Sequence, residues 1–166
     1  MCLPVPYYAA ANDDLVQMAD RHGNVTSLEV SVSGTPRAFS RPRMVYRNVN
    51  HPRVFNPSSA HLRRFRAALL QVTGADSLPI FPRNTHLRLD LLFEIPRPNS
   101  HFTRQVRLKP NTPCFPTDTN IDNLVKFVMD AMQGVVFFDD HTIVIISAAK
   151  VYAQQDRIGK THMFVR

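Results

Sequence analysis

The chain has 166 residues, of which 44% are hydrophobic and 20% are charged, a composition typical of one globular domain with a sizeable core. Its 20 Lys and Arg outnumber 13 Asp and Glu and give a net charge of +7, which indicates an anionic partner, either nucleic acid or an anionic membrane surface. No apolar run approaches the ~20 residues that span a bilayer, and the first residues lack the basic and hydrophobic regions of a secretory signal. We therefore expect a soluble intracellular protein, located in the cytoplasm or nucleoid if the source is a bacterium or a phage.

The N-terminal part of the chain carries the weakest structural signal. We expect an N-terminal arm over residues 1–23, followed by a folded domain over residues 24–166. Apolar residues within 13–20 allow a short helix in the arm.

Two strands and a possible hairpin are predicted in the first hundred residues. Residues 27–33 and 86–95 alternate between apolar and polar side chains, which is typical of half-buried strands. Between them, residues 44–46 and 53–55 can pair as a short hairpin, and an irregular surface loop is the alternative.

Two segments have the apolar spacing of amphipathic helices. The first covers residues 60–72, with N-cap candidates at Ser58 and Ser59 and a closing glycine at Gly74. The second covers residues 120–132.

The remaining segments connect and complete the predicted sheet. Residues 97–116 contain four prolines and no periodicity, which indicates a mobile basic flap. A short apolar strand over 135–138, a turn at 139–140 and strands over 142–152 and 160–165 follow. The order of elements predicts an α/β (α+β) fold: a small single domain with a mixed β-sheet and two main helices.

Positive charge is concentrated in two stretches without acidic residues, one between Glu29 and Asp76 and one between Glu94 and Asp118. A solvated surface explains any single arginine equally well, but two acid-free basic stretches around an acidic cluster favour phosphate binding. Arg66 lies with two other arginines off the apolar face of the first helix, where phosphates can reach it. The candidate DNA-binding residues are Arg37, Arg41, Arg43, Arg47, Arg63, Arg64, Arg104, Arg107, Lys109 and Lys150.

The acidic cluster begins at the second helix, where Asp122 and Lys126 lie one turn apart. Asp139 and Asp140 follow a buried apolar run. Mg²⁺ prefers oxygen ligands and binds through one or two carboxylates, so Asp122 and a carboxylate of the turn meet its needs. Lys126 would then face the same phosphate and stabilise its negative charge. A solvated Asp–Lys pair and an ordinary Asp-Asp turn explain the spacing as well.

Other kinds of site have weaker support. Cys2 and Cys114 are not in a zinc-type spacing, and no glycine-rich phosphate loop or nucleophile dyad is present. None of the seven histidines forms a ligand pair by spacing. His141 adjoins the acidic turn, where it is either a turn residue or a contact to phosphate or water.

Several motifs resemble the RusA family of Holliday-junction resolvases. Residues 122–126 (DNLVK), 130–132 (DAM) and 139–140 (DD) are similar to the family's D-N-L-x-K, D-A-L and D-D motifs, and Lys150 corresponds to a further lysine on the next strand. Residues 41–43 (RPR) resemble a motif found after the first strand of many relatives.

The resemblance implies a small homodimeric α/β enzyme that resolves four-way DNA junctions in recombination and repair. It implies hydrolysis that depends on Mg²⁺, with Mn²⁺ as a substitute, and leaves 3′-hydroxyl and 5′-phosphate ends. By the same resemblance, Asp122 and Asp140 match metal-binding carboxylates, Lys126 matches the catalytic lysine and Asp139 is the neighbouring acid.

One position departs from the family pattern: Asn120 stands where the family has its first aspartate. Asparagine keeps the shape and one oxygen but loses the charge, so metal affinity should fall. Three explanations stay open: a deliberate change that traps an uncut complex, a natural variant in which Asp118 or Asp139 supplies the charge, and a natural relative that binds junctions without cutting. The rival function is therefore a non-cleaving, junction-binding protein. A basic RNA-binding module is the third possibility.

Overall fold

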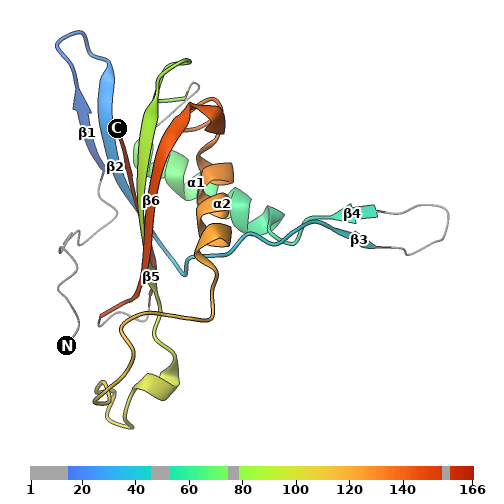
Figure 1. The fold of residues 1–166 in the computed structure, drawn as a ribbon, viewed down its shortest axis with the longest axis vertical. Coiled ribbons are helices and arrows are strands. Elements are labelled where there is room, and N and C mark those ends of the chain that lie inside the picture. The colour runs from blue at the N-terminus through green and yellow to red at the C-terminus, as the bar shows by residue number, and fades with distance from the viewer. Residues whose placement is uncertain (1–14, 46–52, 75–78, 155–157) are drawn as a thin grey trace.

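The computed structural model of the chain describes residues 15–45, 53–74, 79–154 and 158–166. Its main strands are β1 (Leu15–Ala19), β2 (Val25–Ser33), β5 (Leu87–Ile95), β6 (Ile143–Tyr152) and β7 (Lys160–Val165). They form one five-stranded sheet in the order β1-β2-β7-β5-β6 (Figure 1). The β5–β6 pair is parallel and the other pairs are antiparallel, so the predicted mixed sheet is confirmed.

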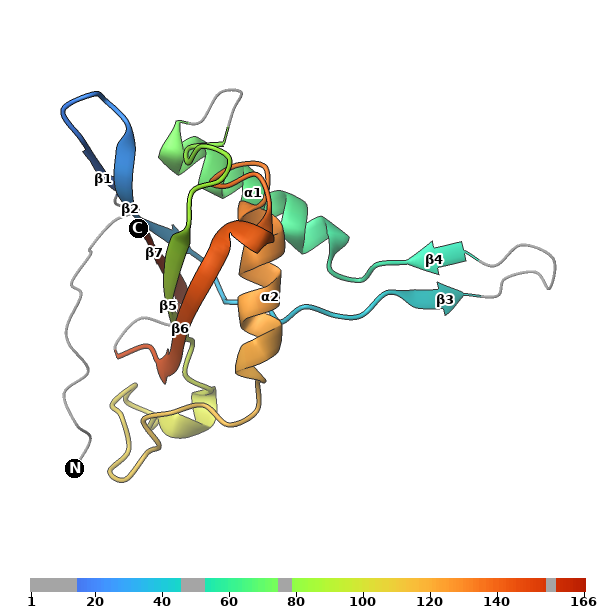
Figure 2. The same cartoon turned by 45° about the horizontal axis from the view of Figure 1, so that its top comes forward.

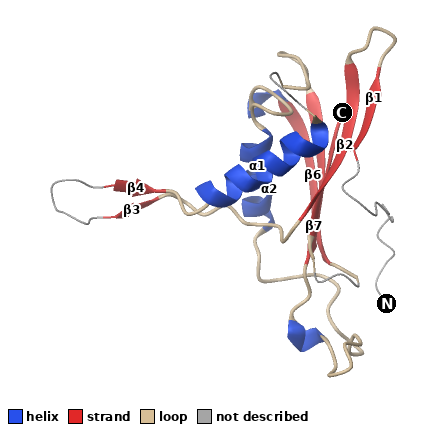
Figure 3. Ribbon diagram, turned by 180° about the vertical axis from the view of Figure 1, so that it is seen from behind, coloured by secondary structure: helices blue, strands red, loops and turns tan. Residues whose placement is uncertain are grey.

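Two helices, α1 (Ser59–Thr73) and α2 (Ile121–Met132), lie against the same face of this sheet (Figure 3). Alternation along the strands directs every second apolar side chain toward them. Each fully buried Leu or Phe contributes about 1.5–3 kcal/mol. The core between sheet and helices includes Leu28, Val30, Leu69, Leu89, Leu91, Phe93, Leu124, Phe127, Val128 and Met163.

The parallel pair β5–β6 fixes the direction of α2. Parallel neighbours need a crossover connection, and here α2 is that connection. The helix therefore runs opposite to β6, with its first residues near the end of β6 and its last residues near the start. The Lys150 ammonium, late in β6, donates a hydrogen bond to the Thr119 carbonyl just before α2 and holds these two ends together.

A two-stranded hairpin projects from the body of the protein (Figure 2). It consists of β3 (Arg43–Val45) and β4 (Arg53–Phe55), which confirms the predicted pairing. Residues 46–52, which include Tyr46 of the predicted hairpin and the candidate Arg47, lie outside the described residues. Val54 and Phe55 are 68% and 56% exposed.

The basic segment between β5 and α2 contains more local structure than the sequence predicts. It includes a 3-10 turn, η1 (Asn99–His101). Arg97 donates to the carbonyls of Pro113 and Ala153, at 2.9 and 3.0 Å, and Lys109 Nζ donates to the Ser100 carbonyl at 2.7 Å. Long side chains thus close this loop, which periodicity cannot predict.

Two predicted elements were wrong. Residues 15–19 form β1 rather than a helix, because the Asp20 carboxylate accepts backbone hydrogen bonds from His22 and Asn24 and turns the chain back onto β2. The earlier arm residues, 1–14, lie outside the described residues. Residues 135–137 are buried, but residues 135–138 form a turn and not a strand, because the Val135 and Val136 amides donate to the Met132 carbonyl at the end of α2.

The first helix starts where the sequence predicts, but Ser58 does not cap it with its side chain. The Ser58 hydroxyl instead accepts a hydrogen bond from the Ser40 amide at 2.8 Å. Gly74 ends the helix in the left-handed conformation, with φ of 62°. The serine therefore ties the segment before the hairpin to α1.

Candidate metal and nucleic-acid site

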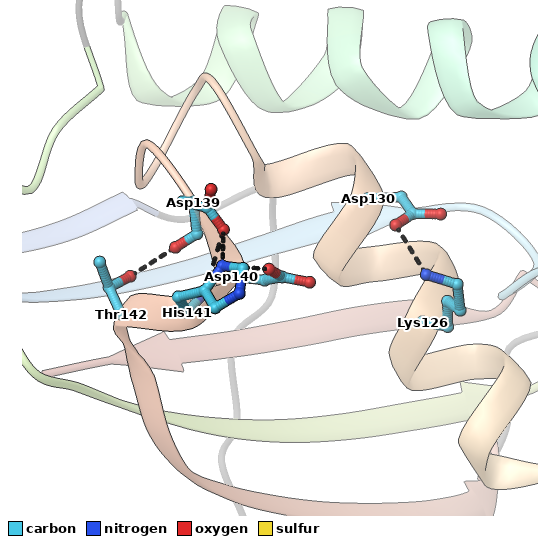
Figure 4. Close-up of polar contacts among 6 residues, drawn as sticks. All are labelled: Lys126, Asp130, Asp139, Asp140, His141 and Thr142. Carbon is cyan, nitrogen blue, oxygen red and sulfur yellow. Dashed lines mark hydrogen bonds and ion pairs between the residues drawn. The ribbon is translucent and has the colours of Figure 1, made fainter.

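The acidic turn before β6 is the strongest metal-binding candidate (Figure 4). Asp139, Asp140 and His141 each offer a ligand atom, and these three atoms lie within 4.8 Å of one another. Asp139 begins the short 3-10 turn η2 (Asp140–Thr142), and its carboxylate accepts the His141 amide hydrogen at 3.1 Å. The Asp139 and Asp140 side chains are 53% and 46% exposed, so an ion has free access.

His141 determines the protonation of this turn. Its Nδ1 lies 2.6 Å from the Asp139 carboxylate and 3.5 Å from the Asp140 carboxylate. The side-chain hydrogen bond from His141 lowers the pKa of Asp139 to about 2, and the same hydrogen bond raises the pKa of His141. Asp139 is therefore ionised at neutral pH. Two adjacent carboxylates with open solvent around them fit a hard divalent ion that keeps several waters.

Lys126 projects from the middle of α2 (Figure 4). Its Nζ lies 3.2 Å from the Asp130 carboxylate and 5.3 Å from the centre of the Phe39 ring. The Lys126 side chain is 56% exposed. An exposed pair of this kind contributes little stability, so the ammonium can turn to another anion at small cost.

The first turn of α2 carries the other predicted ligands. Asn120 occupies the N-cap position with an extended backbone, and its side chain makes no capping hydrogen bond. Asp122 is exposed and makes no hydrogen bond or ion pair within the described part of the chain. A carboxylate is favoured there by the positive end of the helix. Both side chains are thus free to bind an ion.

Within one chain, however, Asp122 and Asp140 lie toward opposite ends of α2. From Asp122 to Met132 the helix advances about 15 Å at ~1.5 Å per residue. The acidic turn follows the last turn of this helix, whereas Asp122 lies near the Lys150 end of β6. The described chain forms no three-ligand group that includes Asp122. Along the chain, most of the length of α2 therefore separates the two expected metal ligands.

Comparison with protein families gives a match over most of the chain. The family model described as Endodeoxyribonuclease RusA matches residues 33–159, which include the hairpin, both helices, the acidic turn and β6. The chain belongs to the RusA endodeoxyribonuclease family. No curated protein matched the chain. Within the described residues, every helix is too short or too polar to span a bilayer.

The predicted basic residues of this RusA-family chain come from three parts of the fold. Arg37 and Arg41 lie between β2 and the hairpin, Arg43 is the first residue of β3, and all three are exposed. Arg63 and Arg64 are exposed on α1. The candidates Arg104, Arg107 and Lys109 belong to the loop that contains η1, and Arg47 lies outside the described residues.

The expectation for Arg66 was wrong. Its guanidinium donates to the carbonyls of Asp130, Ala131 and Gln133, at 2.7 to 3.2 Å. These carbonyls end α2 and have no partner within the helix, so Arg66 caps the negative end of the helix. Arg66 is therefore a structural residue in this RusA-family chain, which no local sequence signal indicates.

The segment between β2 and the hairpin is a further feature that the sequence does not reveal. The Phe39 amide donates to the Asn123 carbonyl of α2 at 2.8 Å. The Ser40 amide donates to Ser58 next to α1. This RusA-family chain thus fixes its first basic segment against both helices, beside Lys126.

Proposed function

We propose that this protein is a Mg²⁺-dependent endonuclease that resolves four-way DNA junctions as a two-fold homodimer. The observation that carries the proposal is the exposed acidic turn before β6, with Lys126 on the adjacent helix, in a RusA-family chain whose basic segments contain no acid. Basic side chains would hold the junction arms by phosphate contacts, and binding would weaken steeply with salt.

Asp139, Asp140 and Asp122 are the residues that would hold the metal ion. When bound, Mg²⁺ polarises the phosphate and promotes ionisation of a bound water. Lys126 would leave Asp130 and place its ammonium against the negative charge that builds up on the phosphate. Mn²⁺ suits the same oxygen ligands and would replace Mg²⁺.

A homodimer is supported by the exposed edge of the sheet at β6. Val144, Ile145 and Ile146 are 58%, 49% and 44% exposed. Consecutive strand residues point to opposite faces, so both faces are uncovered at this edge. An apolar edge strand of this kind is a template for pairing with another strand. We assign the edge to a second copy of the chain, related by a two-fold axis.

Such a dimer would also bring the expected metal ligands Asp122 and Asp140 close together, one from each chain. In an antiparallel pair of β6 edges, the start of one strand lies beside the end of the other. Asp140 precedes the start of β6, whereas Asp122 lies near its end. Each metal site would therefore combine Asp122 of one chain with the partner's Asp140. Two such sites suit a junction that has two strands to cut.

The Asn120 position determines how active this chain is. Asparagine next to the metal offers a weaker, uncharged ligand, so we expect cleavage by the protein as it stands to be slow or undetectable. Asn120→Asp should increase it. The test incubates both forms with a labelled four-way DNA junction and Mg²⁺, with EDTA as the control.

The outcomes separate the candidate functions. Cleavage that needs Mg²⁺ and is faster in the Asn120→Asp variant supports the proposal that the protein is a nuclease. Tight junction binding without cleavage by either form means a non-cleaving binding protein. Equal affinity for a four-way DNA junction and a linear RNA hairpin means a general nucleic-acid-binding module.

A further inference from the structure

A hollow with a volume of about 220 Å³ lies between α1 and the segment that follows β2. Its basic lining residues are Arg37 from that segment and His61 and Arg64 from α1. His61 and Arg64 are three residues apart and therefore lie on the same side of the helix. We call this hollow the Arg37 pocket.

The basic groups of the Arg37 pocket have no acidic partner. Arg37, His61 and Arg64 make no ion pair or side-chain hydrogen bond with any described residue. The chain has no Asp or Glu between Glu29 and Asp76, the stretch that contains all three. Basic side chains collected around one hollow without a counter-charge repel one another and attract an anion.

The remainder of the pocket lining is largely apolar. Phe65, Ala68 and Phe127 contribute to it, and the two phenylalanine rings contact each other edge to face with centroids 5.7 Å apart. The volume is below the roughly 300–1,000 Å³ of drug-sized ligand sites. An anion with a small less polar part, such as one sugar-phosphate unit, matches both the size and the lining.

The Arg37 pocket is connected to the proposed nuclease site through a short piece of chain. Two residues after Arg37, the Phe39 amide donates to Asn123 of α2, and the Phe39 ring lies 5.3 Å from Lys126 Nζ. One face of α2 thus presents Lys126, and another presents Phe127 to the pocket. A DNA strand held at Lys126 would have its neighbouring backbone within reach of Arg37.

We propose that the Arg37 pocket binds one sugar-phosphate unit of the DNA strand that is cut, beside the phosphate held at Lys126. Arg37, Arg64 and His61 contact the phosphate, and the sugar lies toward the apolar lining. The inference rests on the proposed function, since a DNA strand must cross the adjacent site. It adds a fixed position at which that strand is held, apart from the metal ligands.

The first test uses small probes and does not depend on cleavage. Thymidine 5′-monophosphate, thymidine and sulfate are titrated separately into the protein while amide chemical shifts of Gly34, Thr35 and α1 are followed by NMR. We expect saturable shifts with the monophosphate, weaker shifts with sulfate and none with thymidine. The Arg37→Gln, Arg64→Gln double variant should lose them. Equal responses to sulfate and the monophosphate would reduce the pocket to a simple anion site and overturn the sugar-phosphate assignment.

The second test measures junction binding as a function of salt. Arg64→Gln should weaken binding roughly tenfold, as expected for a lost charged hydrogen bond, and should reduce the salt slope by about one. Arg21→Gln, an exposed arginine in the β1–β2 turn, is the control with the same charge change and should leave binding unchanged. Melting curves confirm that both variants are folded.

The two tests distinguish failure of the pocket from failure of the proposed function. The protein could show chemical-shift changes at the pocket with the monophosphate and yet neither cut junctions nor bind them preferentially. This result would support the binding site and contradict the nuclease proposal. The opposite result is Mg²⁺-dependent junction cleavage without chemical-shift changes at the pocket, together with junction binding by Arg64→Gln equal to that of the control variant. It would support the nuclease proposal and contradict the pocket proposal.

Discussion

At Asp140 the proposed metal role can be separated from a structural one. The carboxylate is 46% exposed, and its only described ion pair is the 3.5 Å contact with His141. In the Asn120→Asp background, Asp140→Asn should abolish Mg²⁺-dependent cleavage and leave junction binding within a few-fold. Gel-based cleavage and binding assays measure both. The control is Glu29→Gln, which removes a carboxylate from β2, on the face of the sheet away from the helices, and should cut normally.

A catalytic role of Lys126 can also be distinguished from a role in stability. Its pair with Asp130 is an exposed i,i+4 contact, which contributes only about 0.3–0.5 kcal/mol. Lys126→Met should therefore lower the cleavage rate at least tenfold while the melting temperature changes by no more than a few degrees. A collapse of the melting temperature would show that the lysine is structural.

His141 is expected to titrate above the ordinary range for histidine in the metal-free protein. The hydrogen bond to Asp139 raises the pKa of His141, so this contact stabilises the turn fully below the usual histidine pKa and is lost as the pH rises through the raised value. An NMR titration of the His141 ring measures it. Asp139→Asn should return the pKa toward the ordinary value, and an unchanged titration would contradict the pairing.

The β3–β4 hairpin projects from the body of the protein and exposes apolar side chains. An isolated hairpin is marginal in water, yet this one exposes Val54 and Phe55 next to arginines. A two-stranded ribbon fits a DNA groove. The Val54→Ser, Phe55→Ser double variant should bind the junction several-fold more weakly, as measured by fluorescence anisotropy. Its melting temperature, measured by calorimetry, should not change.

The matched control for the hairpin is Ile158→Ser. Ile158 is an equally exposed aliphatic residue, at 60%, but lies just before β7 on another part of the fold. It should have no effect on junction binding. An equal loss in both variants would indicate a general effect of surface polarity rather than a DNA contact.

At the scale of the whole molecule, mixed dimers test whether the metal site is shared between chains. In the Asn120→Asp background, dimers that pair an Asp122→Ala chain with an Asp140→Ala chain contain one intact shared site and one doubly damaged site. They should nick one strand of the junction, whereas each variant alone should not cut. Denaturing gels of the purified mixed dimers measure this. No nicking would mean that both ligands belong to one chain.

The same dimer predicts the behaviour of its edge strand. Ile145→Lys places a charge on the exposed β6 edge and should give a folded monomer in sedimentation experiments. Since both sites would be incomplete in the monomer, cleavage should be lost with the metal ligands unchanged. A wild-type monomer at micromolar concentration would contradict the dimer.

The sequence alone determined the features that depend on local periodicity and on chemical identity. Alternation identified β2 and β5, apolar spacing identified both helices, and the family-like motifs identified the acidic turn, because these signals arise from residues close together in the chain. Only the tertiary structure decided which distant residues meet. It assigned Arg66 to the end of α2, collected Arg37, His61 and Arg64 around one hollow, and placed Asp122 and Asp140 toward opposite ends of α2. These contacts between distant residues depend on the parallel β5–β6 crossover and on long side chains that reach across the fold. Neither feature produces a periodic pattern in the sequence, so the sequence alone does not reveal it.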